Sequence, residues 1–228
     1  MTEQLQKVTN MHGRWYDDAC GAAFALELVG ERWALLVVRE LMLGARRFSD
    51  IRASLPGISA KTLTDKLAWL EEIGVVERTI LPPPAASRVY GLTEWGRGLE
   101  EVLQVLGRWA VQSPLHDPTL PFSAVSFLLS LRTMFDPLAA AGEDMWIGFE
   151  IGPEHYVARL RAGTLSVHRA VTPLAAPALR FSAPTAGDFL PVFYGKRSPE
   201  EAGGRLTIEG DPDVARRFIA LFGLPPKV

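Results

Sequence analysis

The most constraining feature of this chain is a short amphipathic segment between residues 59 and 74. Ser59 is of a residue type that caps helices, because its side-chain oxygen can accept from the free N–H groups of the first turn. Leu63, Leu67 and Leu70 follow at spacings of four and three, so they share one face of a helix. Gly74 can adopt the left-handed conformation that ends a helix. The segment therefore predicts a helix over residues 59–73 with one apolar face.

The residues on either side of this helix indicate a winged helix. A short stretch with one apolar face, 49–54, comes before it and is joined to it by a Pro56-Gly57 turn, which makes a helix-turn-helix. Alternating residues predict two strands after it, which form a wing over residues 76–92. In a winged helix the second helix of the motif lies in the major groove of DNA, and the wing lies on the backbone or the minor groove. Further helices are predicted near residues 20–29, 32–43 and 94–111.

The charge of this region differs from that of the whole chain. The formal net charge is −2, so attraction to DNA must come from a local patch. Between Arg39 and Lys66 the sequence has six basic and three acidic residues. Lys61 and Lys66 also lie near the start of the predicted helix, and Glu71 and Glu72 lie near its end, opposite to the order that the helix dipole favours. Both features predict an anionic partner at the helix start, with double-stranded DNA as the candidate.

Eight polar residues are candidates for DNA contact. Lys61, Thr62 and Lys66 would meet phosphates or base edges, and Asp65 could accept from cytosine N4. The alternatives are a solvated helix face, a Lys61–Asp65 pair at spacing i,i+4, and a Lys66 stem that lies over the core. The set also includes the capping serine, two arginines before the first helix of the motif and one arginine in the wing. It consists of Arg46, Arg47, Ser59, Lys61, Thr62, Asp65, Lys66 and Arg88.

Several motifs follow one another in the first half of the chain. They are Gly30-Glu31-Arg32-Trp33, Arg47-Phe48-Ser49-Asp50-Ile51, Pro56-Gly57-Ile58-Ser59, Gly74-Val75-Val76-Glu77-Arg78 and Tyr90-Gly91-Leu92-Thr93-Glu94. In this order and spacing they resemble the HxlR-type, MarR-related transcriptional regulators, over about residues 15–111. The resemblance implies a homodimer that binds a palindromic operator and pairs through its N-terminal helix and the helix after the wing. Two-fold symmetry would place two recognition helices about one DNA turn apart.

The single cysteine, Cys20, excludes an intramolecular disulfide, which fits a reducing cytoplasm. The N-terminus lacks a signal-peptide pattern, and no apolar run reaches the ~20 residues of a membrane span. Several members of the resembled family carry a sensing cysteine near the N-terminus. Here Asp17 and Asp18 should raise the pKa of the thiol, and Gly21 stands where a proline usually follows the family cysteine. We therefore expect a cytoplasmic protein in which Cys20 is buried or unreactive.

The second half of the chain has a different pattern. A polar, proline-bearing linker precedes an amphipathic helix over 122–138. Short alternating runs then predict five strands, with helices near 184–194 and 211–222. The predicted fold is α+β: a winged helix-turn-helix domain, then a five-stranded antiparallel meander with helices on one face. The strands are placed at 145–151, 155–160, 163–169, 178–182 and 205–209, and the domains at 1–113 and 122–228, with 114–121 as the linker.

A second resemblance is carried by four segments of this half: the hairpin at Ala162-Gly163, the strand 178–182 with its helix, Phe193-Tyr194-Gly195-Lys196, and residues 204–211. They resemble the sterol-carrier-protein-like fold, loosely and over about residues 122–224. The resemblance implies an apolar cavity between sheet and helices for a fatty or sterol-like molecule. Six aromatic residues could line it; plain core packing and an additional dimer surface are the alternatives. They are Trp146, Phe149, Phe181, Phe189, Phe193 and Phe218.

The sequence has no catalytic or metal-binding pattern. His12, His116, His155 and His168 are scattered and lack the spacing of metal ligands, and phosphate-binding and nucleophile motifs are missing. The sequence therefore predicts a homodimeric DNA-binding transcriptional repressor, which is not an enzyme and needs no cofactor. An apolar small molecule in the C-terminal domain would be its effector. The alternative is a lipid-binding or carrier protein whose winged helix serves mainly for dimerisation.

Overall fold

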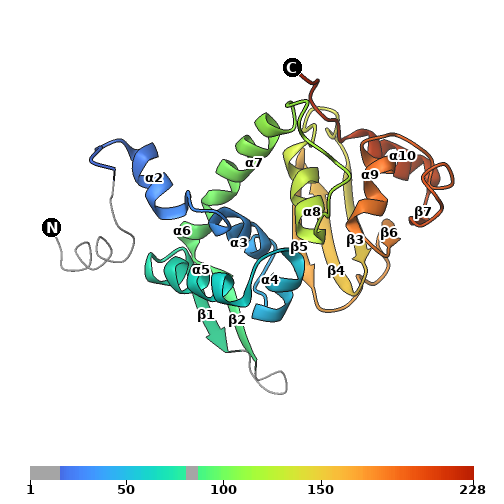
Figure 1. The fold of residues 1–228 in the computed structure, drawn as a ribbon. Helices are drawn as coiled ribbons and strands as arrows, with labels where there is room; N and C mark the ends of the chain where they lie inside the picture. The colour runs from blue at the N-terminus through green and yellow to red at the C-terminus, as the bar shows by residue number, and fades with distance from the viewer. Residues whose placement is uncertain (1–15, 81–86) are drawn as a thin grey trace.

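The computed structural model describes residues 16–80 and 87–228. In Figure 1 the chain forms two regions side by side, the first in blue and green and the second in yellow to red. Most of the polar segment at the N-terminus lies outside the described residues, and so does the proline-rich tip of the wing. Among the described residues, no helix combines the length and the apolar character needed to cross a membrane.

The first region contains the helix-turn-helix and its wing. Its helices and strands are α2 (Gly21–Val29), α3 (Ala34–Leu41), α4 (Phe48–Ser54), α5 (Ala60–Glu72), β1 (Val76–Ile80), β2 (Arg88–Leu92), α6 (Glu94–Arg97) and α7 (Leu99–Ala110). These elements confirm the winged helix-turn-helix, in which α4, the Pro56-Gly57 turn and α5 form the motif and β1 and β2 form the wing. The single helix predicted over 94–111 is instead divided at Gly98 into α6 and α7.

Helix α5 forms where the sequence predicts it, for the predicted reasons. The Ser59 hydroxyl accepts from the Thr62 N–H at 3.0 Å, as a capping serine does. Leu63, Leu67 and Leu70 are at most 1% exposed, so the expected apolar face is the buried one. Burial of this face against the rest of the first region leaves the polar side of α5 outward.

Hydrogen bonds tie α2 and the wing to this motif. The Trp69 indole N–H of α5 donates to the Leu28 carbonyl of α2 at 2.8 Å. In the wing, Tyr90 exchanges two backbone hydrogen bonds with Arg46, at 2.9 and 2.8 Å, just before α4 begins. The position of the wing is therefore fixed relative to the helix-turn-helix.

The second region is an α+β unit around one sheet. Its elements are α8 (Ala124–Thr133), β3 (Asp144–Ile151), β4 (Glu154–Arg161), β5 (Thr164–Ala170), β6 (Leu179–Ala183), η1 (Ala186–Phe189), α9 (Leu190–Phe193), β7 (Thr207–Gly210) and α10 (Pro212–Ala220). The helix predicted over 122–138 is shorter, since α8 ends at Thr133. Pro137 disfavours helical backbone in the residue before it, which accounts for the early end.

The five-stranded sheet is mixed, which corrects the antiparallel meander expected from the sequence. Its strand order is β5-β4-β3-β6-β7, and β6 pairs with β3 in parallel, whereas the other pairs are antiparallel. After β5 the chain crosses back over residues 171–178 and joins the other side of β3. Alternating side chains identify the two faces of a strand but not the strand that pairs with it. The sequence pattern therefore could not predict the crossover.

Aromatic rings fill the space between the sheet and its helices, of which α8 and α9 lie over one face in Figure 1. The Phe149 and Phe181 rings lie 5.4 Å apart, and Phe193 lies 5.1 Å from Phe181. Phe189 and Phe218 belong to the same cluster, and all five residues are at most 1% exposed. The expectation that these residues line a ligand cavity is therefore wrong, because their own rings occupy the space.

Trp146, the sixth aromatic residue expected at the cavity, lies on the opposite face of the sheet. It is 47% exposed, and the Arg159 guanidinium lies 4.8 Å from its ring centroid. Its neighbours in β3, Met145 and Ile147, are buried. Successive residues of a strand point to opposite faces, so Trp146 cannot share the core with Phe149 and its partners.

Candidate nucleic-acid interface

The first two turns of α5 present polar side chains to solvent. The Lys61 side chain is 87% exposed and that of Asp65 is 58% exposed, and their charges pair at 2.9 Å. Exposed pairs of this kind contribute only about 0.2–1 kcal/mol, so a phosphate can replace Asp65 as the partner of Lys61 at small cost. Thr62 is partly exposed, and its hydroxyl lies 2.8 Å from that of Ser59. These four candidate residues are therefore together at one exposed end of α5.

Arg47 and Arg88 are exposed cations on the elements that precede and follow α5. Arg47 is the N-cap residue of α4, and Arg88 is the first residue of β2. Within residues 16–80 and 87–228, neither guanidinium takes part in an ion pair. Both charges are thus available to an outside anion.

Arg46, also expected at DNA, is buried instead. Its side chain is 2% exposed, with Nη1 2.7 Å from Glu40 and Nη2 2.7 Å from Glu154. Glu40 is fully buried and also accepts from Arg39 at 2.9 Å and from the Ser123 hydroxyl at 2.8 Å. If Arg46 bound a phosphate, these carboxylates would stay buried without their cationic partner, which is costly. The Arg46 side chain is therefore not available to a phosphate. Arg46 instead joins α3 of the first region to β4 of the second.

This buried network continues into the sheet, and it was not predicted from the sequence. Glu154 accepts from Arg169 at 3.0 Å and from the Tyr156 hydroxyl at 2.9 Å. Burial raises the pKa of the Tyr156 phenol above its usual range, so it remains a neutral donor. The Arg169 backbone N–H donates to the Leu43 carbonyl at 2.8 Å. One signal was present: Glu40 interrupts the apolar run of α3, where an unpaired charge would be costly.

Lys66 is turned away from solvent as well. Its side chain is 13% exposed and pairs with Glu31, which lies between α2 and α3. Burial lowers the pKa of the Lys66 ammonium. The expected DNA contact is therefore corrected, and the alternative in which the stem lies over the protein is the one observed.

Two helices of the first region leave apolar side chains exposed. On α7, Val105 is 64% and Trp109 is 72% exposed, and Val102 and Leu106 extend the same stripe at spacings of three and four. On α2, Leu26 is 58% exposed. A contiguous exposed apolar surface marks an interaction site. These are the first described helix and the helix after the wing, where pairing was expected.

Cys20 is exposed, which corrects the expectation of a buried thiol. It is the N-cap residue of α2, where the backbone N–H groups of Ala23 and Ala22 lower the pKa of the thiol. The prediction that Asp17 and Asp18 raise this pKa is also wrong. Their carboxylates are exposed and screened by solvent, whereas the N–H groups of the first turn of α2 lie next to the thiol and lower its pKa.

In the part of the chain that is described, no group of three or more His, Cys, Asp or Glu side chains is arranged to hold a metal ion. The arrangement around α5 is instead that of a surface for an extended anion. An exposed polar helix start, with arginines on α4 and β2 that form no ion pair with other described residues, can follow a phosphate backbone.

Residues 28–116 match the model of the HxlR-like helix-turn-helix family. The chain is 36% identical over 88 residues to the HTH-type transcriptional regulator YvaP of Bacillus subtilis (strain 168), which covers 39% of this chain and 82% of YvaP. It is 41% identical over 88 residues to the HTH-type transcriptional regulator YodB of the same strain, with 39% of this chain and 79% of YodB covered. The solved reduced form of YodB covers 44% of this chain and 100% of its own, at 37% identity and a TM-score of 0.39.

Proposed function

The chain belongs to the HxlR-like helix-turn-helix family of DNA-binding transcriptional regulators, and we propose that it represses transcription as a homodimer on a palindromic operator. The observation that carries the proposal is the exposed polar start of α5, with the exposed Arg47 and Arg88 on the neighbouring elements, which form no ion pair with another described residue. Because the whole chain has a formal charge of −2, this local surface must supply the attraction to phosphates.

Each exposed residue has a part in this proposal. Helix α5 enters the major groove, where Lys61 binds a phosphate and Thr62 and Asp65 face base edges. The Asp65 carboxylate accepts from a cytosine N4, which explains why an acidic residue lies within a cationic surface. Arg47 binds the backbone where α4 begins, and Arg88 follows the backbone or minor groove from the wing. The serine that caps α5 lies at the same end of the helix.

The exposed apolar faces of α2 and α7 support the homodimer. Pairing through them would remove Trp109 and Val105, now 72% and 64% exposed, from water. A two-fold axis there would set the two α5 helices about one DNA turn apart, roughly 34–36 Å. The operator would then be a pseudo-palindrome, and the bound dimer would block access to it.

The division into domains belongs to the same proposal. Residues 1–113 bind DNA and dimerise, 114–121 form the linker, and 122–228 form a sterol-carrier-like α+β domain. Two separate clusters of buried apolar side chains support it, one between Val29 and Leu92 and one mainly between Ala124 and Phe222. The carrier function loses its support, because aromatic rings fill the cavity that it required. Since the target is DNA, we place the protein in the cytoplasm.

The experiment is recovery and footprinting of the DNA that the purified protein binds from its own genome. We expect two protected half-sites about 10 bp apart, or a multiple of that spacing. Arg88→Ala should lose protection at the edge that the wing covers. Arg161→Ala is the matched control, because this arginine is 73% exposed on β4 of the other region. A single asymmetric footprint would contradict the homodimer, and the absence of any preferred site would contradict the function.

A further inference from the structure

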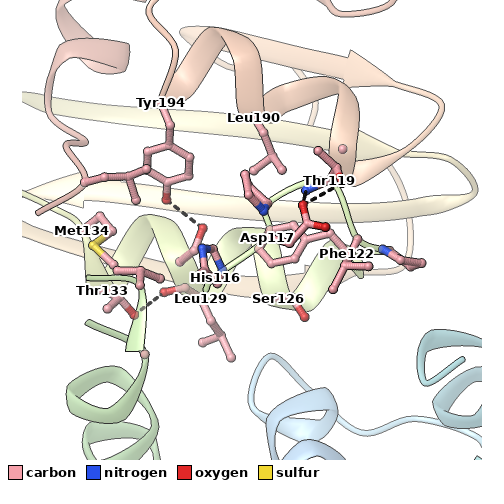
Figure 2. Close-up of a pocket in the computed structure, with 18 of the residues that line it drawn as sticks. His116, Asp117, Thr119, Phe122, Ser126, Leu129, Thr133, Met134, Leu190 and Tyr194 are labelled. Carbon is pink, nitrogen blue, oxygen red and sulfur yellow. Dashed lines mark hydrogen bonds between the residues drawn. The ribbon is translucent and has the colours of Figure 1, made fainter. Parts of the chain in front are cut away.

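A cavity of about 1010 Å³ lies where the two regions meet. Helix α7 forms one wall, α8 and α9 form another, and the linker covers it. Figure 2 shows Tyr194 and Leu190 on one side and Leu129 on α8, close to the linker that carries His116. The lining includes none of the six aromatic residues that the sequence suggested. Its volume is at the upper end of the range for small-molecule sites, about 300–1,000 Å³.

The cavity wall is largely apolar, and its polar side chains include Glu100, Gln104 and a pair of hydroxyl groups. Leu103, Leu129 and Leu190 contribute to the apolar part. The Ser130 and Tyr194 hydroxyl oxygens lie 2.7 Å apart. Ser130 already donates to a backbone carbonyl at 2.7 Å, so Tyr194 must be the donor between the two. The lone pairs of the Tyr194 oxygen are then left to accept a hydrogen bond. Burial raises the pKa of this phenol, so it stays protonated at neutral pH.

Gly107 lies in the cavity wall within α7, three residues before its end. A glycine inside a helix is about 1 kcal/mol less favourable than alanine. The backbone there is helical, and an added Cβ would meet no described atom within 4 Å. Neither conformation nor crowding by the described residues requires a glycine. What its missing side chain does provide is open space in the cavity.

Segments of the chain itself occupy part of the cavity's border, which favours a small molecule over a second protein as its occupant. The linker covers one side, and Leu224 of the C-terminal tail is part of the lining. The tail is held in place because Lys227 Nζ donates to the carbonyls of Val111 and Ser113, at 2.9 and 2.8 Å. Helix α7 thus has two separate faces, a cavity face that contains Gly107 and the exposed apolar stripe around Trp109.

We propose that this cavity binds a small apolar alcohol, with its hydroxyl donating to Tyr194 and its hydrocarbon body between α7 and α8, and that its binding changes DNA affinity by shifting α7. The inference rests on the proposed function, because α7 affects DNA binding only if its exposed face holds the partner protomer. The ligand acts through the difference between its affinities for two placements of α7. The arrangement of the two α5 helices follows from that placement.

The test uses N-phenyl-1-naphthylamine, a neutral dye whose emission rises in apolar surroundings, with dodecan-1-ol as the competitor. Gly107→Phe puts a ring into the cavity, and Gly107→Ala is the matched control, because it strengthens the helix without filling the space. We expect the wild type and Gly107→Ala to bind the dye and release it to dodecan-1-ol. Gly107→Phe should bind both at least ten times more weakly. Tyr194→Phe should keep the dye but weaken dodecan-1-ol about 2- to 12-fold, as for one hydrogen bond.

Three results would overturn the site. The first is no dye binding to the wild type. The second is equal binding by Gly107→Phe, which would put the dye on the exposed stripe of α7. The third is dye binding that arises only after removal of residues 1–15, which would make that segment the occupant. If Gly107→Phe no longer melts cooperatively, Gly107→Leu is judged by the same criterion.

A DNA titration separates this inference from the proposed function. Saturating dodecan-1-ol should change the operator affinity of the wild type and Gly107→Ala about fivefold or more, the range of allosteric coupling. The affinity of Gly107→Phe should not respond. An unchanged wild-type affinity would refute the regulation while the ligand-free protein still bound its operator. Failure of the ligand-free protein to bind any DNA would instead refute the proposed function, whatever the dye does.

Discussion

Arg46→Ala would remove the cation that two carboxylates share at the junction of the two regions. Arg46 is 2.7 Å from both Glu40 and Glu154, and its side chain is 2% exposed. Removal of one partner from a buried ion pair costs about 3–5 kcal/mol, because the other charge stays buried without it. Here Glu40 keeps Arg39 and Glu154 keeps Arg169. We therefore expect a loss at the lower end of that range, about 3 kcal/mol of unfolding free energy.

Thermal unfolding followed by calorimetry measures this loss. For a chain of this length 1 kcal/mol corresponds to roughly 2–4 °C, so Arg46→Ala should lower Tm by about 6–12 °C. The matched control is the neighbouring Arg47→Ala, which changes an exposed side chain and should cost less than about 0.5 kcal/mol. DNA titrations below the melting range give the second readout. Arg47→Ala should lower the salt slope by about one, and Arg46→Ala should leave it unchanged. An Arg46→Ala protein with an unaltered Tm and a reduced slope would refute this reasoning.

Three further predictions concern other parts of the molecule. Trp109→Glu should weaken the dimer at least about 30-fold, as loss of a central aromatic does, while Leu138→Glu, at an 87% exposed site outside the stripe, should leave the mass in sedimentation unchanged. The rate of Cys20 alkylation should rise with pH with a midpoint below the ordinary thiol pKa of 9.0, because the pKa of Cys20 is lowered. A midpoint at or above 9.0 would contradict the effect of the helix start on this thiol. Phe193→Ala should cost about 3–5 kcal/mol in denaturant unfolding, and a cost below about 1 kcal/mol would mean that the rings leave a cavity after all.

The winged helix could be predicted because each of its parts is specified locally. A capping serine, leucines at spacings of four and three, and a glycine stop are enough to define α5. Lys61 and Arg47 are positively charged. Once α5 is placed, their positions therefore predict exposed positive charge on and beside this helix. Such features depend on residues close in sequence, where periodicity and turn chemistry are informative.

The errors arise where distant segments meet. Arg46 and Arg47 are adjacent arginines, and the buried one differs in pairing with Glu40 in α3 and with Glu154, far along the chain. The crossover that puts β6 beside β3 likewise depends on pairing that no local pattern encodes. The cavity behind α7 exists only because the linker, α8 and α9 are placed against it. Gly107 is the one sign of this cavity in the sequence, and a single glycine inside a helix does not by itself specify a cavity.

The most direct test of the claim that the exposed start of α5 binds DNA is the salt dependence of operator affinity. The logarithm of Kd is measured against the logarithm of salt concentration for the wild type, Lys61→Ala, Lys61→Ala with Arg88→Ala, and the control Arg161→Ala. Each phosphate-binding cation contributes about one to the slope, so the slope should fall by about one in the single variant and about two in the double variant. Arg161→Ala should follow the wild type. Wild-type affinity and slope in both the single and the double variant would contradict the account.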